Sequence, residues 1–234
     1  MKEEIIKSME KSSNERKKMM LDSVYYNNKA YAYGKEKELS RIIKAMEKVD
    51  RKDFVLGADK EDAYVDTPLF IGHGQTISQP TTVARMLLLL ELEKGIDVLE
   101  IGSGSGWNAA LISFLIFPGK VTSIERIKEL SEFAKKNFEA GKKKFKEGKA
   151  EFVFGSALDR KSKIWKGKYD RIITTAAADS FLAEELKKMG KLLNEEGLLL
   201  FPTERGAMEL WKKSKGKLEL VYREVGYAFV PLVK

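Results

Sequence analysis

The chain lacks cysteine and contains a single histidine among its 234 residues. Without cysteine there can be no disulfide, thiolate metal site or cysteine nucleophile. The first residues, Met1-Lys2-Glu3-Glu4, lack the apolar core of a signal sequence, so a cytoplasmic location is expected. The longest apolar run, Ala109 to Pro118, is about half of what a bilayer span needs, so no membrane partner is expected.

Positive charge is in excess, with 43 basic and 35 acidic residues and a net charge of +8. Much of the excess lies in Lys135-Lys136 and in the run from Lys142 to Lys146. A basic surface can bind nucleic acid or acidic protein. Here glutamates are interspersed, and no aromatic or arginine side chains interleave to stack bases. We therefore interpret the run as a solvated helix face and expect no nucleic-acid partner.

The most informative segment is Asp97-Val98-Leu99-Glu100-Ile101-Gly102-Ser103-Gly104-Ser105-Gly106. It predicts a short apolar strand that ends in a glycine-rich turn, followed by an apolar helix over 107–117. A second strand over 121–124 then stops at Glu125. This order is typical of the nucleoside-binding half of a doubly wound fold, where the acid accepts hydrogen bonds from the ribose hydroxyls.

The glycine spacing indicates which ligand binds. Dinucleotide sites favour G-x-G-x-x-G, in which a pyrophosphate sits on the helix N-terminus. Glycines at 102, 104 and 106 give G-x-G-x-G instead, which is familiar from S-adenosylmethionine sites that have no phosphate to hold. The alternatives are a glycine-rich turn in another α/β protein and a dinucleotide enzyme with shifted glycines.

The rest of the chain alternates helices and strands, which predicts an α/β fold with a doubly wound, mostly parallel sheet. Antiparallel strands are expected from Met208 onward. Residues 1–36 are expected to be a helical N-terminal appendage, interrupted at Ser12-Ser13-Asn14, and residues 37–234 the main domain. Residues 50–72 are expected to be a loop, and Ser78 is a candidate N-cap for a helix with Pro80 in its first turn. Further helices are expected over 38–49, 127–140 and 180–189, and further strands over 151–154, 170–175 and 197–201.

A second segment resembles a known family. Asp66-Thr67-Pro68-Leu69-Phe70-Ile71-Gly72-His73-Gly74-Gln75-Thr76-Ile77-Ser78-Gln79-Pro80 is similar to the signature segment of protein-L-isoaspartate O-methyltransferases. Further similar segments lie at 98–108, 123–126, 169–173, 175–178 and 228–232, so the resemblance spans about residues 38–234. It implies a Rossmann-like class I methyltransferase. The implied reaction moves a methyl group from S-adenosylmethionine to the α-carboxylate of an L-isoaspartyl residue and leaves S-adenosylhomocysteine. The ester then collapses to a succinimide, which can reopen as aspartate.

The resemblance also implies site residues. Ser78 corresponds to the family's active-site serine, which aims the acceptor carboxylate. For His73 a role in loop structure is favoured over catalysis. The partners implied are damaged proteins and peptides with L-isoaspartyl residues, bound by a monomer. The expected substrate-binding residues are Thr76, Ile77, His73, Val230, Pro231 and Leu232. The expected cofactor-binding residues are Glu100, Gly102, Ser103, Gly104, Gly106, Asn108, Glu125, Arg126, Ser156, Ala157 and Thr175.

The chemistry suits a chain with one histidine. A carboxylate with a pKa near 4 is already ionised at pH 7, so no strong general base is required. The protein has to align oxygen, methyl and sulfur and to exclude water. A Ser-His-Asp hydrolase is disfavoured, because no G-x-S-x-G nucleophile elbow is followed by a histidine.

The sequence departs from the family pattern beside the adenine site. Ser156 stands where the family usually has an acidic residue, and Asp159 is the alternative reader of the adenine amino group. Asp179 follows the alanine run where proline is usual. Two other functions stay open at this point. One is a methyltransferase with another acceptor such as RNA, and the other is a non-catalytic homologue that binds the cofactor.

Overall fold

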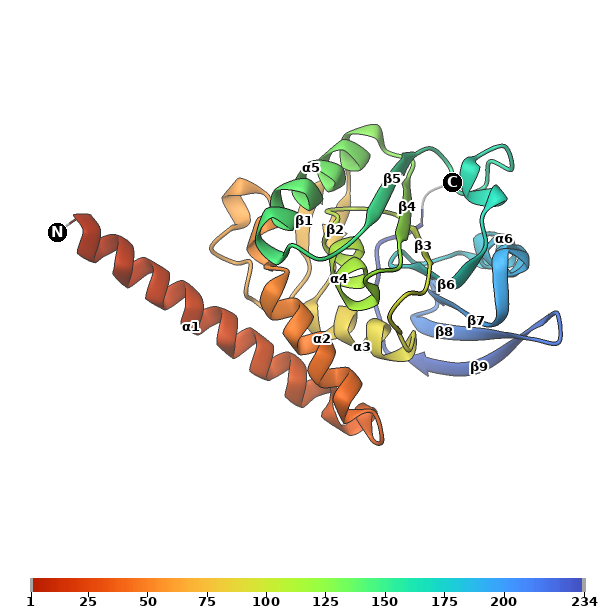
Figure 1. Cartoon of the computed structure of the whole chain (residues 1–234), viewed down its shortest axis with the longest axis horizontal. Helices are drawn as coiled ribbons and strands as arrows, with labels where there is room; N and C mark the ends of the chain where they lie inside the picture. The colour runs from red at the N-terminus through yellow and green to blue at the C-terminus, as the bar shows by residue number, and fades with distance from the viewer. Residues whose placement is uncertain (1, 233–234) are drawn as a thin grey trace.

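Seven strands form the central sheet of the computed structural model, which describes residues 2–232 and the side chains of residues 11–232 (Figure 1). Their order is β5-β4-β3-β6-β7-β8-β9. Strands β3 to β7 run parallel, and β8 and β9 are antiparallel, as the sequence predicted. The bounds are β3 (Val98–Ile101), β4 (Val121–Glu125), β5 (Ala150–Phe154), β6 (Tyr169–Thr174), β7 (Leu193–Pro202), β8 (Ala207–Ser214) and β9 (Lys217–Val225).

Helices cover both faces of this sheet. One buried cluster packs α2 to α5 against one face, and a second packs Leu182 and Leu186 of α6 against Leu199 and Phe201 of β7 on the other. The arrangement confirms the doubly wound α/β fold. The helices are α1 (Lys2–Lys29), α2 (Glu36–Lys48), α3 (Pro80–Leu89), α4 (Trp107–Ile116), α5 (Lys128–Phe145) and α6 (Ser180–Lys188).

The strand order reverses beside β3. Strand β4 pairs with one side of β3, and β6 pairs with the other. All residues of β3 and β4 are buried, as expected for parallel strands covered on both faces. In an open α/β sheet the ligand crevice lies outside the carboxyl ends of the strands at such a switch point. The glycine-rich turn follows β3 and Glu125 ends β4, so both lie at this edge.

Helix α1 corrects the sequence analysis. It runs from Lys2 to Lys29 without a break, although an interruption was predicted at Ser12-Ser13-Asn14. Each of these polar residues costs a helix only about half a kcal/mol, which its flanking residues can offset. The last turns of α1 pack on α2 and α3, and Met20 and Val24 are part of the main core. The opposite end projects beyond the rest of the fold (Figure 1). The division at residue 36 stays a prediction.

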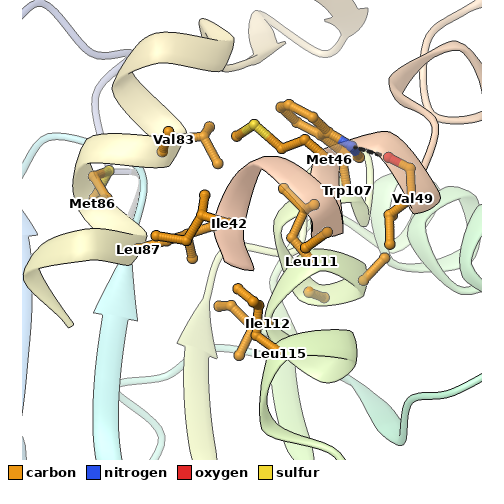
Figure 2. Close-up of a cluster of buried hydrophobic side chains, with 14 of the residues drawn as sticks. Ile42, Met46, Val49, Val83, Met86, Leu87, Trp107, Leu111, Ile112 and Leu115 are labelled. Atoms are coloured by element: carbon orange, nitrogen blue, oxygen red, sulfur yellow. Dashed lines mark hydrogen bonds between the residues drawn. The ribbon is translucent and has the colours of Figure 1, made fainter. Parts of the chain in front are cut away.

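Side chains from α2, α3 and α4 meet in one apolar cluster (Figure 2). Figure 2 labels Ile42 and Met46 of α2, Val83 of α3 and Leu111 of α4 among the residues of this cluster. The Trp107 indole N–H donates a hydrogen bond of 3.0 Å to the carbonyl of Val49. The start of α4, directly after the glycine-rich turn, is therefore fixed to the end of α2. 

Residues 50–72, which the sequence predicted to be a loop, end in the first strand of a small hairpin. It pairs β1 (Leu69–Gly72) with β2 (Gln75–Ile77) in antiparallel register. His73 at its turn has a φ of 55°, between two glycines that also have positive φ. The Ile71 side chain lies beside Gly104, since a Cβ built there would be 3.5 Å from Ile71 Cδ1. The hairpin thus packs on the glycine-rich turn.

We expect Leu111→Ala to lower the free energy of unfolding by about 2–5 kcal/mol, because it removes buried methyl groups and leaves a cavity between helices. Leu111 is fully buried in the cluster of Figure 2. Leu220→Ala on β9, where the side chain is 45% exposed, is the control and should cost much less. Denaturant titration measures both variants, and equal losses would contradict the assignment of this core.

Candidate active site

Two glycines of the glycine-rich turn serve different purposes. Gly106 has a φ of 85°, and a Cβ there would lie 2.7 Å from the Ala134 carbonyl oxygen, so it lets α4 approach α5. Gly102 has a φ of 89°, but an added Cβ would meet no atom within 4 Å. Gly102 faces open space, as does Gly155 after β5 with a φ of 144°. Both line the same cavity, which leaves room for a ligand against their backbone.

That cavity, which we call the apolar cavity, holds about 630 Å³ of empty space, including the open solvent at its mouth. Its walls come from the ends of β3, β4 and β5, from α6 and from residues 226–232 after β9, which we call the C-terminal segment. Most of its lining side chains are aliphatic, as suits a flat heteroaromatic ring. They are Gln75, Ile101, Gly102, Ile124, Glu125, Arg126, Ile127, Gly155, Ser156, Ala157, Leu158, Ala176, Leu182, Leu186, Pro231 and Leu232.

Glu125 supplies the negative charge of the apolar cavity. Its Oε2 accepts a hydrogen bond of 3.2 Å from the Gly104 amide, and its Oε1 accepts one of 3.0 Å from the Ile127 amide. These bonds fix the carboxylate between the glycine-rich turn and the start of α5. A carboxylate has about four acceptor positions, so capacity remains for two ligand hydroxyls.

A smaller polar hollow of about 310 Å³ lies beside the apolar cavity, with Gly104 in its wall. Glu100 is completely buried here; its carboxylate accepts hydrogen bonds from Asn108 Nδ2, at 2.8 Å, and from Ser123 Oγ. Burial raises the pKa of Glu100 to about 7, although both hydrogen bonds lower it. Among the described side chains, Asn108 Oδ1 is a buried acceptor with no hydrogen bond. The hollow therefore presents one carboxylate and one free acceptor, which suit a cationic group.

A third space, the outer hollow, holds about 690 Å³ of empty space, including the open solvent at its mouth. It shares Thr76, Ser78 and Thr175 with the polar hollow, so these three side chains lie between the two. Its remaining lining residues come from the position before β1, from the start of α3 and from the C-terminal segment. They are Pro68, Gln79, Thr82, Ala228, Phe229 and Val230.

The C-terminal segment lies beside Ala177, three residues after the end of β6, and is hydrogen-bonded to it. The Ala177 amide donates to the Val230 carbonyl at 2.8 Å, and the Leu232 amide donates to the Ala177 carbonyl at 2.7 Å. Val230 lines the outer hollow, while Pro231 and Leu232 line the apolar cavity. The resemblance implied substrate binding for all three, and of these only Val230 lines the outer hollow.

Most of the expected site residues line one of the three spaces. Ile77, Glu100, Ser103, Gly104 and Asn108 line the polar hollow. His73 does not line any of them and is exposed at the turn of the hairpin. Gly106 is likewise absent from all three walls, because it serves helix packing.

The two candidate adenine readers lie in different places. Ser156 lines the apolar cavity, and its Oγ accepts a hydrogen bond of 3.2 Å from the Leu158 amide. Asp159 does not line the cavity, and its carboxylate accepts a hydrogen bond of 2.9 Å from the Lys161 amide.

One expectation about Ser78 is wrong. Gln79 occupies the N-cap position of α3 and makes no side-chain capping bond, so Ser78 lies one residue before the cap. Pro80 is in the first turn, as predicted. Ser78 is half-buried and lines both the polar and the outer hollow.

Several residues in and behind the walls of the three spaces were not predicted from the sequence, among them Gln75, Gln79 and Arg51. Gln75 and Gln79 lie inside the signature segment 66–80, which could have indicated them. Arg51 had no such signal. It lies in a non-periodic stretch, yet it is completely buried and donates a hydrogen bond of 3.2 Å to the Ser78 carbonyl.

Comparison with known proteins identifies the family. The family model described as "Protein-L-isoaspartate(D-aspartate) O-methyltransferase" matches residues 22–234. A protein-L-isoaspartate O-methyltransferase from Thermococcus onnurineus is 43% identical over 202 residues, which cover 82% of this chain and 85% of that protein. The enzyme of the same name from Pyrococcus horikoshii is 42% identical over 196 residues, covering 82% and 84% of the two chains.

A solved structure has the same fold. A Plasmodium falciparum protein described as a protein-L-isoaspartate O-methyltransferase, in complex with S-adenosyl-L-homocysteine, superposes with a TM-score of 0.73. It is 27% identical, and the match covers 90% of this chain and 97% of that one.

Within residues 2–232, none of the helices has the length and apolarity to cross a membrane. The chain therefore belongs to the protein-L-isoaspartate O-methyltransferases, enzymes that use S-adenosylmethionine to methylate L-isoaspartyl residues for protein repair.

Proposed function

We propose that the three spaces divide the reaction among them. The apolar cavity takes the adenosine of S-adenosylmethionine, with Glu125 on the ribose hydroxyls and Ser156 at the adenine edge. The polar hollow takes the methionine end beside Glu100 and Asn108. The outer hollow takes the L-isoaspartyl residue. The observation that carries the proposal is that Ser78 lines both the polar and the outer hollow, where a methyl group and its acceptor would meet.

The cofactor's sulfonium supplies an electrophilic methyl group and its own leaving group. The acceptor carboxylate is already ionised at neutral pH, so the chain needs no strong base. The Ser78 hydroxyl donates a hydrogen bond to one carboxylate oxygen and directs the other toward the polar hollow. Thr76 and Thr175, which share both walls, offer further hydroxyls. Orientation and exclusion of water are the chain's contributions to the rate.

Recognition of the damaged protein rests on the C-terminal segment. Ala228, Phe229 and Val230 form one wall of the outer hollow. Backbone groups of such a wall can bind the backbone of an extended peptide without reading its side chains. This suits an enzyme that accepts an isoaspartyl residue in many sequence contexts. 

We further propose that the enzyme acts in the cytoplasm as a monomer. The lack of cysteine suits a reducing compartment. An RNA acceptor and a non-catalytic role are disfavoured by the relatives at about 40% identity, which are named for the repair activity.

Glu125→Ala should weaken binding of S-adenosylmethionine by 10- to 100-fold, about 1.4–2.8 kcal/mol, because charge-assisted bonds to two ribose hydroxyls are lost. Titration calorimetry measures the dissociation constant. Glu129→Ala removes the same charge from the exposed first turn of α5 and serves as the control. Unchanged affinity of Glu125→Ala would remove Glu125 from the site.

Binding of S-adenosylmethionine should release protons between pH 6 and 7.5, because its positive charges favour the ionised form of Glu100. The pKa of this carboxyl is raised to about 7 by burial, so it is mostly protonated at pH 6 in the free protein. Affinity should therefore increase as pH rises through this range. Calorimetry in buffers of different ionisation enthalpy counts the protons, and Glu100→Gln should abolish the part that Glu100 contributes. Identical proton release in both proteins would contradict the assignment.

The same raised pKa has a consequence for stability. Because the folded protein holds the proton of Glu100 more tightly than the unfolded chain, this group contributes stability below pH 4.5. The contribution is lost as the pH rises through about 7. Saturation with the cofactor should oppose that loss, which thermal melts at pH 5 and pH 8 can test with Glu100→Gln as the control.

Ser78→Ala should lower turnover of an isoaspartyl peptide by roughly 10- to 1,000-fold, about 1.4–4 kcal/mol of transition-state stabilisation. Cofactor affinity should barely change. Since Ser78 does not cap α3, the free energy of unfolding should change by less than about 0.5 kcal/mol. Single-turnover rates with labelled S-adenosylmethionine measure the effect, with an aspartyl peptide and RNA as acceptor controls. Ser40→Ala on α2 is the protein control, and wild-type rates in Ser78→Ala would contradict this site.

A further inference from the structure

The Arg51 guanidinium is completely buried between the hairpin and α4. Its Nη1 donates to the carbonyls of Ala63, at 2.8 Å, and Val65, at 3.2 Å. Its Nη2 donates to the carbonyls of Thr67, at 2.8 Å, and Ser78, at 3.2 Å. One side chain thus binds four backbone positions at once.

These positions flank the hairpin on both sides. Ala63, Val65 and Thr67 precede β1, and Ser78 directly follows β2. The guanidinium also lies over the ring of Trp107, 5.5 Å from its centroid. Trp107 begins α4 and lines the polar hollow with Ser78. Arg51 therefore joins the base of the hairpin to the element that follows the glycine-rich turn.

A buried cation is a costly way to hold loops together. Burial lowers the pKa of Arg51 to about 10, and the negative charge of Asp66 acts in the opposite direction. Asp66 itself accepts hydrogen bonds from the amide and hydroxyl of Thr81, in the first turn of α3. The rigid fork of a guanidinium can bind several carbonyls in a fixed geometry, which a lysine cannot. The backbone held in this way lies just before β1 and just after β2, next to the part of the hairpin that lines the outer hollow.

We propose that Arg51 is a positioning residue for methyl transfer. Its guanidinium fixes the backbone of Ser78 relative to α4, so that the acceptor oxygen lies in line with the methyl group. An in-line displacement is sensitive to this distance, because a misplacement of about 1 Å can lower a rate by about 100-fold. The inference rests on the proposed role of Ser78, on which Arg51 acts without touching the reactants.

The test compares two arginine-to-lysine variants. Arg41 also bridges two carbonyls, with Nη1 3.2 Å from that of Leu92 and Nη2 3.0 Å from that of Leu115, and it lines none of the three spaces. Arg51→Lys should lower single-turnover rates on an isoaspartyl peptide at least about tenfold, while the dissociation constant for S-adenosylmethionine stays within about twofold. Arg41→Lys should keep the wild-type rate. Equal rates in the two variants would overturn the proposal.

A double-mutant cycle tests whether Arg51 acts through Ser78. In a Ser78→Ala background, Arg51→Lys should have little further effect on the rate. Additive losses would mean that Arg51 acts elsewhere and would overturn the proposal. If Ser78→Ala alone keeps the wild-type rate, the role proposed for Ser78 fails instead, which distinguishes the two failures.

A second variant covers failure to fold. If Arg51→Lys does not bind S-adenosylmethionine stoichiometrically, Arg51→Gln replaces it, because the amide keeps a donor without a buried charge. The same rates and affinities are then compared with Arg41→Gln. Loss of cofactor binding in both Arg51 variants would contradict a positioning role, since the residue would then be needed for the fold as a whole.

Discussion

The parallel pairing of β3 with β4 on one side and β6 on the other is the constraint on which the rest of this structure depends. The register aligns Ile101 with both Ile124 and Thr174, so the three strands end at one level. The glycine-rich turn and Thr175 directly follow β3 and β6, and Glu125 is the last residue of β4. Because the chain leaves β3 in one direction and returns to its other side, a crevice opens between the connections. The three spaces of the site lie in and around that crevice.

Two buried ionisable groups distinguish the site from the apolar core around it. Glu100 and Arg51 are both fully buried. Glu100 lies in the wall of the polar hollow, and Arg51 lies against the two ends of the hairpin. Neither is needed to fill the core, since the clusters on both faces of the sheet are apolar. Glu100 faces the space suited to a cationic ligand, and Arg51 holds the chain that carries Ser78. Both lie beside the proposed site, whereas Arg85, which is also buried, pairs with Glu224 away from the three spaces.

The reaction itself explains the composition of the site. The acceptor is an ionised carboxylate, and its methyl donor brings its own leaving group, so the enzyme has no need of a histidine base. The single histidine is exposed at the hairpin turn. What remains is placement of the acceptor. The outer hollow, where we propose that the acceptor binds, is built from three distant parts of the chain, namely residues 68–82, Thr175 and residues 228–230. A site that only positions its acceptor suits the substrates of this family, because they share one damaged residue and little else.

The sequence by itself determined the positions of the sheet strands, of the glycine-rich turn and of Glu125 at the end of β4, because hydrophobic runs and glycine-rich turns are local signals. It also carried the segment 66–80 by which the family is recognised. Only the tertiary structure decided that residues 69–77 form a hairpin, that Pro231 and Leu232 face a different space from Val230, and that Ser78 precedes the cap of α3. It alone brought Arg51 to Ser78, because the hydrogen bond joins residues 27 positions apart and no periodicity records such a contact.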